Sequence, residues 1–153
     1  MGEAVKLIAK NRRAFYDYSI EDRWEAGIVL EGTEIKSVKE GRISFSDAWA
    51  EIVSGEIWLN QMSISENPFS SLFNHEPLRK KKLLLHKSEI KRLTRKVDLK
   101  GFTLVPLSFY LKRGRVKVEL GLCKGKKSFD KRAGIRERDI ERETAREFRN
   151  RYS

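Results

Sequence analysis

The 153-residue sequence contains few of the residues that cross-link a fold or coordinate a metal: one cysteine, two histidines and three prolines. The lone Cys123 excludes an intrachain disulfide, as is typical of proteins of a reducing cytoplasm. The two histidines are not at a metal-ligating spacing, and one cysteine does not complete a zinc site. No apolar run reaches the roughly 18 residues of a membrane-spanning helix. The N-terminus lacks the apolar segment of a signal peptide, so secretion is not expected.

Motifs for catalysis are equally scarce. The sequence has no Walker loop, no dinucleotide-binding glycine pattern and no nucleophile elbow, and the GKGKK run after Cys123 lacks the spacing and context of a phosphate loop. Glu25 and Glu34 could form a carboxylate pair, although surface carboxylates on a basic domain are the commoner interpretation. We therefore expect a binding protein with no catalytic residue, no metal and no cofactor.

What the sequence has in excess is positive charge. It contains 33 Lys and Arg against 22 Asp and Glu, a formal charge of +11. Residues 130–153 hold eight Lys or Arg and six Asp or Glu, a net of +2, so the preceding 129 residues carry the other +9. A surface of this sign most often faces phosphates, and a membrane surface is the main competitor.

Alternating apolar residues predict β-strands through most of the chain. Two antiparallel strands are expected over 16–20 and 24–30, with a turn at 21–23. A short helix is expected over 33–42, with Thr33 as its N-cap and Gly41 at its end. Further strands are expected at 48–52 and 56–62 around a tight turn at 54–55, and at 102–112 and 115–123 around Arg113-Gly114.

The remaining segments complete the expected domain. Residues 63–78 read as a long loop, and Ser88 is expected to cap a helix whose Ile90, Leu93 and Val97 face inward. Pro106 indicates an edge or a bulge in its strand. The pattern predicts a mainly β protein with short helices, a small and partly open antiparallel barrel of about six strands.

The C-terminal segment has helix-forming composition but little apolar content. Ile140, Phe148 and Tyr152 repeat at roughly helical spacing, a stripe too thin to hold a helix against a core. We therefore divide the chain into a folded domain, 1–129, and a basic tail, 130–153, that is disordered or helical depending on its context.

Three basic clusters are candidates for binding. Asn11-Arg12-Arg13 precedes the first predicted strand and is equally well explained as a solvated loop. The run from Arg79 to Lys82 adjoins three leucines and His86, of which one or two leucines belong to the core and another is available to pack on a base. His86 could stack on a base or instead be buried or cap a helix. The third cluster is either a solvated charged face or an electrostatic contact to nucleic acid; it comprises Lys124, Lys126, Lys127, Lys131 and Arg132.

Four stretches together resemble the SsrA-binding protein family, also called small protein B. They are EAGIVLEGTEIKSVKEGR at 25–42, HEPLRKKKLLLHKSEI at 75–90, TLVPLSFYLKRGRVKVELGLCKGKK at 103–127 and DKR at 130–132. The match extends in order from Asn11 to about Asp139. Each stretch alone is weakly specific, whereas the four in series are highly specific.

The resemblance implies an oligonucleotide-binding (OB) type barrel that binds the tRNA-like part of transfer-messenger RNA (tmRNA) in the bacterial cytoplasm. It implies that Glu25 accepts hydrogen bonds from a base or ribose, while Leu84 and His86 pack and stack on loop bases. Other residues are then expected to hold the phosphate backbone; these are Asn11, Arg12, Lys36, Arg79, Lys81, Lys124, Lys126 and Lys127.

The resemblance also implies a role for the tail. It is expected to enter the empty messenger channel of the small ribosomal subunit, to become helical there, and to contact the decoding centre through Asp130, Lys131 and Arg132. Ile140 and Phe148 would be available to dock on the ribosome. Many relatives have His or Tyr where this chain has Phe129, which retains stacking but loses ring hydrogen bonding. Elongation factor Tu is an expected further partner, through the charged tmRNA.

Two other functions remain open from the sequence. A structural ribosomal protein is also basic with an extension, and it would co-purify stoichiometrically with a subunit. An RNA-processing enzyme would contain a residue whose loss abolishes turnover without weakening binding.

Overall fold

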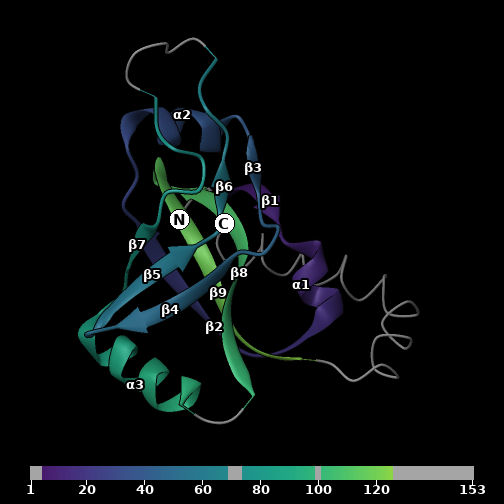
Figure 1. Ribbon diagram of the computed structural model, residues 1–153, viewed down its shortest axis with the longest axis vertical. Helices are drawn as coiled ribbons and strands as arrows, with labels where there is room; N and C mark the ends of the chain where they lie inside the picture. Colours follow the sequence, from purple (N-terminus) through teal and green to yellow (C-terminus); the bar gives the residue numbers. More distant parts are fainter. Residues whose placement is uncertain (1–4, 69–73, 99–100, 126–153) are drawn as a thin grey trace.

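A computed structural model describes residues 5–68, 74–98 and 101–125 of the chain (Figure 1). These residues form nine strands and three helices. In chain order they are β1 (Val5–Lys10), α1 (Arg12–Asp17), β2 (Tyr18–Ile28), α2 (Gly32–Lys39), β3 (Ile43–Ser44), β4 (Trp49–Val53), β5 (Glu56–Asn60), β6 (Ser63–Ile64), β7 (Lys81–Leu84), α3 (Lys87–Val97), β8 (Phe102–Lys112) and β9 (Arg115–Gly125).

Six strands close into a ring in the order β8-β4-β5-β7-β2-β9, with β9 pairing back to β8. All of these pairings are antiparallel, and β1 adds to the outer edge of β8. The ring is not a clean barrel, because β4 meets β8 at one residue pair, Ala50 with Leu104. The predicted fold class, mainly antiparallel β with about six barrel strands and short helices, is confirmed. The tail lies outside the described residues, so the boundary at 129/130 stays a prediction.

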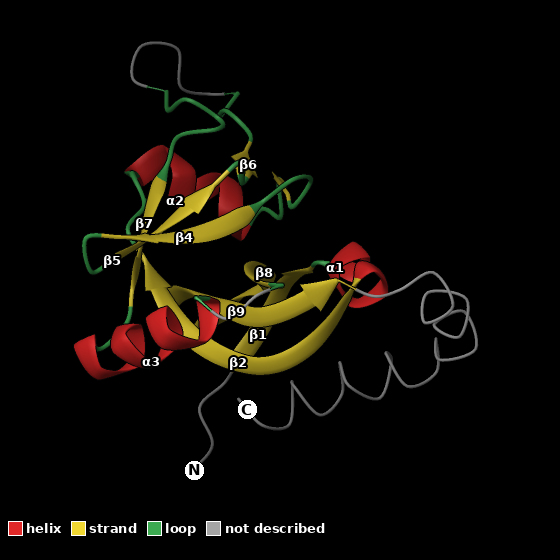
Figure 2. Ribbon diagram, turned by 60° about the horizontal axis from the view of Figure 1, so that its bottom comes forward, coloured by secondary structure: helices red, strands yellow, loops and turns green. Residues whose placement is uncertain are grey.

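The ring encloses the main core, whose fully buried members include Ile57, Leu59, Leu83 and Leu120. Helix α3 packs on this core through Leu93, which is buried, and through the half-buried Ile90 and Val97, as predicted. Figure 2 shows α3 and α1 on opposite sides of the curved sheet. The described residues contain no helix that is both long and apolar enough to cross a bilayer.

The predicted hairpin over residues 16–30 is wrong. Tyr18–Ile28 is a single strand, and the expected turn at 21–23 is a bulge where the β2–β9 register shifts between Ile20 and Asp22. Such a bulge inserts one extra residue and changes the face to which the following side chains point. Ile20 accordingly packs in a smaller second cluster with Cys123, whereas Ala26 lies in the main core.

The N-terminal elements also differ from the prediction. Residues 12–17 form the short helix α1, because the Asn11 side chain accepts a hydrogen bond from the Ala14 amide and satisfies the open helix end. Tyr16 therefore lies on a helix rather than a strand. Strand β1 has no counterpart in the prediction, since it depends on pairing with β8, about a hundred residues away in the sequence.

The other predicted strands and helices are confirmed, with corrections at the helix starts. The predicted loop over 63–78 begins with strand β6, and residues 69–73 lie outside the described residues. Both hairpins form at the expected turns, and the register of β8 shifts between Pro106 and Ser108, the bulge that the proline indicated. Helix α2 is capped by Glu31, not Thr33, and α3 begins after His86, not Ser88. In each case a glutamate three residues on accepts the hydrogen bond of the capping residue's amide.

Candidate nucleic-acid interface

A row of paired residues crosses four neighbouring strands on the outer face of the ring. Leu84 of β7 pairs with Gly27 of β2, Gly27 pairs with Lys117 of β9, and Lys117 pairs with Tyr110 of β8. Directly paired residues point to the same side of a sheet, so their side chains share one face. Glu25, two residues before Gly27 on β2, points to this side as well. We call this surface the outer face.

Gly27 leaves the outer face without a side chain at its position. A side chain there would place its Cβ 3.2 Å from the Leu84 Cβ, a closer approach than ordinary van der Waals contact. The glycine thus lets Leu84 lie flat against β2. Beside it, a shallow hollow is lined by apolar and basic residues; these include Ile28, Val29, Leu84, Arg115 and Lys117.

Glu25 is held in position by two side chains of β8. The Tyr110 hydroxyl donates a hydrogen bond to Glu25 Oε2 at 2.5 Å, and Lys112 Nζ lies 3.4 Å from both carboxylate oxygens. Tyr110 is fully buried, whereas 26% of the Glu25 side chain is exposed. Its exposed oxygen surface is a hydrogen-bond acceptor, because a carboxylate at neutral pH has no proton to donate.

Four cations share a hollow with this carboxylate. The hollow is lined by Glu25 together with Lys112, Arg113, Arg115 and Lys117. The acceptor thus lies beside a group of cations that attracts phosphate. These four residues were not among the binding candidates predicted from the sequence. The signal was present in LKRGRVK, but only the register between β2, β8 and β9 shows that this turn returns to Glu25.

Leu84 and His86 supply the apolar and aromatic part of the surface. Leu84 is 51% exposed, while its neighbours Leu83 and Leu85 contribute to the core, as the sequence predicted for this trio. His86 is exposed, and its amide donates to Glu89 Oε1 at the start of α3. His86 lies two residues after Leu84, beyond the end of β7, and is the N-cap residue of α3.

Comparison with known proteins assigns the family. The family model described as SmpB protein matches residues 8–150. This chain belongs to the SmpB family. A Treponema denticola protein named SsrA-binding protein is 61% identical over 145 residues, which are 95% of this chain and 94% of that protein. A Treponema pallidum protein of the same name is 56% identical over 151 residues, with 99% and 98% covered.

A solved structure gives the same result for the fold. A chain from "tmRNA-SmpB: a journey to the center of the bacterial ribosome" has a TM-score of 0.67 with 48% sequence identity. The similarity covers 78% of this chain and 85% of that chain. At this identity the resemblance extends to the family as well as to the fold, so the sequence-based assignment to the SmpB family is confirmed.

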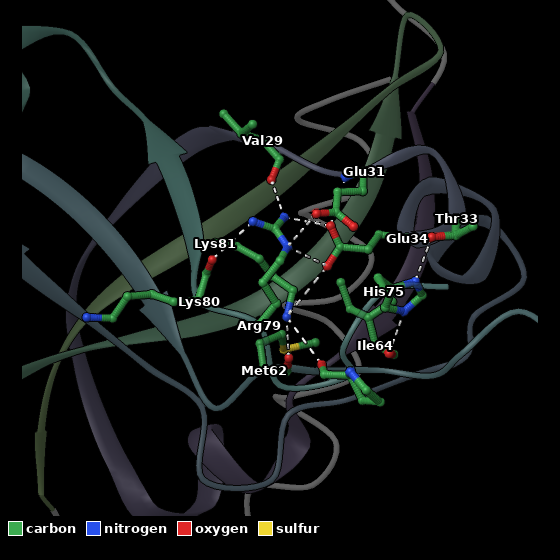
Figure 3. A network of polar contacts seen from close by, with 11 residues as sticks. Val29, Glu31, Thr33, Glu34, Met62, Ile64, His75, Arg79, Lys80 and Lys81 are labelled. Carbon is green, nitrogen blue, oxygen red and sulfur yellow. Dashed lines mark hydrogen bonds and ion pairs between the residues drawn. The ribbon is translucent and has the colours of Figure 1, made fainter. Parts of the chain in front are cut away.

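Within this SmpB-family domain, the structure gives Arg79 an internal role. Arg79 Nη2 donates to Glu34 Oε1 at 2.6 Å and to the Val29 carbonyl at 3.2 Å, and Nε donates to Glu34 Oε2 at 3.3 Å (Figure 3). Glu34 is fully buried, and its hydrogen bonds raise the pKa of Arg79 above its ordinary value. The expected phosphate contact of Arg79 does not fit this geometry, because its donors are used within the fold.

Lys81 is also an internal residue, against the prediction that it binds RNA. Its side chain is 0% exposed, and Nζ donates to the Met62 carbonyl at 2.7 Å and lies 4.0 Å from Glu34 (Figure 3). Desolvation by burial lowers the pKa of Lys81 to about 8, although the nearby Glu34 charge acts in the opposite direction. Alternation along β7 explains the error, since Lys81 and Leu83 share the inward side.

His75 joins the same region of the SmpB-type fold. It is buried, with Nε2 2.9 Å from the Ile64 carbonyl and Nδ1 2.8 Å from Thr33 Oγ1. A carbonyl only accepts, so Nε2 donates to Ile64, and Nδ1 shares a hydrogen bond with the threonine hydroxyl. His75 therefore fastens the 63–78 segment to α2.

Asn11 is likewise structural. It is buried, and Nδ2 donates to the Pro106 carbonyl at 2.9 Å while Oδ1 caps α1. Its expected phosphate contact is corrected accordingly. Arg12 is exposed on α1, on the side of the domain opposite β7 and α3 in Figures 1 and 2, so the structure does not bring it together with Leu84.

The remaining candidates divide between exposed and undescribed positions. Lys36 is exposed on α2. Lys124 is exposed at the far end of β9, seven residues from Lys117 and thus about 24 Å along the strand. The other predicted contacts lie outside the described residues; these are Lys126, Lys127, Phe129, Asp130, Lys131, Arg132, Ile140 and Phe148.

Proposed function

We propose that this chain is an RNA-binding accessory factor of trans-translation that binds the tRNA-like domain of tmRNA. The observation that carries the proposal is the outer face, where an oriented carboxylate shares a hollow with four cations and an exposed leucine lines the neighbouring hollow. An exposed histidine follows that leucine by two residues. Relatives named SsrA-binding protein cover nearly the whole chain, which supports the choice of RNA.

The outer face suits an RNA loop rather than a regular duplex. Loop bases are unstacked, so their flat faces are free to lie on Leu84 and His86. Base amino and imino groups, or a ribose hydroxyl, would donate to Glu25, which accepts without competing protons of its own. Arg113, Arg115 and Lys117 would neutralise the backbone phosphates around that loop.

The second part of the proposed function takes place on the ribosome. The protein would deliver tmRNA to the A site of a stalled ribosome, with elongation factor Tu recruited through the charged tmRNA. Residues 130–153 would probe the empty messenger channel near the decoding centre, with the DKR stretch as the anchor. A bacterial cytoplasmic location and the lack of a catalytic step are parts of the same proposal.

The test of the outer face is a gel-shift titration of the tRNA-like domain of tmRNA at fixed salt. We expect the double variant Leu84→Ala/His86→Ala to lower the affinity about tenfold or more, since base stacking contributes about 1–3 kcal/mol per base. Both side chains are exposed, but His86 is the N-cap of α3, so the thermal midpoint is measured beside the affinity to show that the variant is folded at the assay temperature.

A matched control is Val53→Ala/Tyr16→Ala, which removes exposed apolar side chains of β4 and α1 from outside the outer face. The control should bind RNA like the parent protein. Equal affinities of the parent and the Leu84/His86 variant would contradict the proposed RNA face.

A further inference from the structure

The outer surface of α3 carries a row of cations that the proposed function does not use. Lys87, Lys91, Arg92 and Arg95 are all exposed. Within the described part of the chain, none of the four makes an ion pair, whereas cations of the neighbouring strands do, for example Lys82 with Glu56 at 3.6 Å. These four side chains therefore present uncompensated charge.

The acidic residues of the helix do not neutralise this row. Glu89 is used at the helix start, where it accepts from the His86 amide at 3.1 Å. Asp98 caps the opposite end of the helix. The fifth cation, Lys96, turns the other way, with Nζ 2.9 Å from Asp22 of β2 and 5.2 Å from the centre of the Trp24 ring. The helix thus uses one cation to fasten itself to the sheet and exposes the other four.

The geometry of the row favours a regular line of phosphates. Lys87, Lys91 and Arg95 are four residues apart, so they lie on one side of the helix at intervals of about 6 Å. Arg92 lies next to this line, and its guanidinium is suited to bidentate contact with a phosphate. The helix that carries the row is held in place on the domain, because Leu93 on its opposite side is fully buried in the core.

A membrane surface fits this helix less well than a nucleic acid. A helix that lies in a bilayer interface inserts a free apolar side. Here that side is used, since Ile90, Leu93 and Val97 pack on the core of the domain. The exposed side also carries no aromatic residue on which single-stranded bases could stack. Of these three candidate partners, the phosphate backbone of a regular double helix fits the exposed row best.

The position of α3 ties it to the outer face. The helix begins at Lys87, directly after His86. An RNA whose loop bases lie on Leu84 and His86 would therefore carry its adjoining stem toward α3. We propose that the exposed row of α3 binds the phosphate backbone of double-helical RNA, as an extension of the loop-binding outer face; this rests on the RNA-binding function proposed above.

The test uses two RNA probes and the full chain. The first probe is a blunt 16-base-pair RNA duplex without a loop, and the second is the tRNA-like domain of tmRNA. The variant is Lys91→Gln/Arg95→Gln, because glutamine has nearly the helix propensity of the residues that it replaces. The matched control is Lys6→Gln/Lys39→Gln, which removes the same charge from exposed positions on β1 and α2.

We expect the α3 variant to lower the salt dependence of duplex binding. The slope of log affinity against log salt should decrease by about two relative to the control, one unit for each lost phosphate contact. Binding of the tRNA-like domain should weaken in the same variant. An unchanged duplex slope relative to the control would overturn the α3 proposal.

Different results would refute the proposed outer face and the proposed α3 surface. The Leu84→Ala/His86→Ala variant should weaken binding of the tRNA-like domain and leave duplex binding unchanged. Loss of binding in that variant with no effect of the α3 variant on either probe would refute the α3 surface alone. If the α3 variant instead lost only binding to anionic phospholipid vesicles, α3 would be a membrane surface and the proposal would also be refuted.

Discussion

Glu25 is a carboxylate within a surface of cations, and two neighbouring side chains define its orientation. Tyr110 is buried and donates to one oxygen, while Lys112 lies within 3.4 Å of both. Glu119 is directly opposite Glu25 on β9, and its charge is offset by Arg23 at 3.2 Å. Without such partners, two carboxylates facing each other across a ladder would repel.

The first prediction concerns the residue that orients this acceptor. Tyr110→Phe removes only the hydroxyl, so Glu25 loses a fixed orientation and keeps its charge. We expect the affinity for the tRNA-like domain of tmRNA to decrease about three- to tenfold, which corresponds to the net contribution of one typical hydrogen bond. Filter binding at fixed salt measures the effect, with the thermal midpoint recorded beside it.

Tyr16→Phe is the matched control, because its phenol is exposed on α1. In a Glu25→Gln background, Tyr110→Phe should cause little further loss, since the two residues act as one unit. Additive losses in the double variant would show that Tyr110 does not act through Glu25.

Single residues differ in how far the sequence revealed their roles. The exposed Leu84 among three leucines was predictable, because a short strand beside a core leaves one side to solvent. The burial of Lys81 and the internal hydrogen bonds of Arg79 were missed, because both depend on contacts with the distant segment 29–34. The cations around Glu25 were missed for the same reason, since strand register brings them together.

At the scale of elements, local signals were sufficient for two hairpins and for helices α2 and α3, but not for α1. The tight turns at 54–55 and 113–114, and the apolar stripe of α3, depend on neighbours in the sequence, so the pattern predicted them. The bulge in β2 was interpreted as a turn, because a break in a strand pattern is the same in sequence whether the chain reverses or bends. Closure of the ring through β7 was not predictable from local pattern.

The buried network at the start of β7 fastens that strand to α2. Lys81 and Arg79 both approach Glu34, and Lys81 also donates to the carbonyls of Met62 and Pro77. Because Leu84 lies at the other end of this four-residue strand, the network positions one part of the outer face.

The second prediction tests this network through stability. Lys81→Met keeps the length of the side chain but removes the ammonium that donates to the buried Met62 carbonyl, so we expect the free energy of unfolding to fall by about 1–3 kcal/mol at pH 7. Urea denaturation measures the difference. Lys80→Met is the control; Lys80 is exposed and its pair with Glu51 lies at the surface, so stability should hardly change.

The difference in stability between the parent protein and Lys81→Met should depend on pH. The pKa of Lys81 is about 8 in the folded chain against 10.5 as its ordinary value. Between these pH values the unfolded chain binds more protons at this site, so this group adds stability as the pH rises from about 8. The stability difference between the parent protein and Lys81→Met should therefore widen from pH 8 to 10. A constant difference over that range would contradict the buried, destabilised ammonium.

At the scale of the whole molecule, charge is divided between a folded domain and a terminal segment. The outer face and α3 adjoin at His86, while α1 lies on the opposite side of the sheet (Figure 2). Residues 134–153 contain six arginines and five acidic residues, a net of only +1. Removing them therefore costs little of the total attraction to RNA.

The most direct test of the proposed division between domain and tail compares the full chain with a chain that ends at Ala133, in two assays. The first is the affinity for the tRNA-like domain of tmRNA, and the second is tagging of incomplete peptides on stalled ribosomes. We expect unchanged RNA affinity and complete loss of tagging, because we propose that RNA recognition belongs to the described domain and the ribosomal step to the tail. Loss of RNA binding by the shortened chain, with its thermal midpoint preserved, would contradict that division.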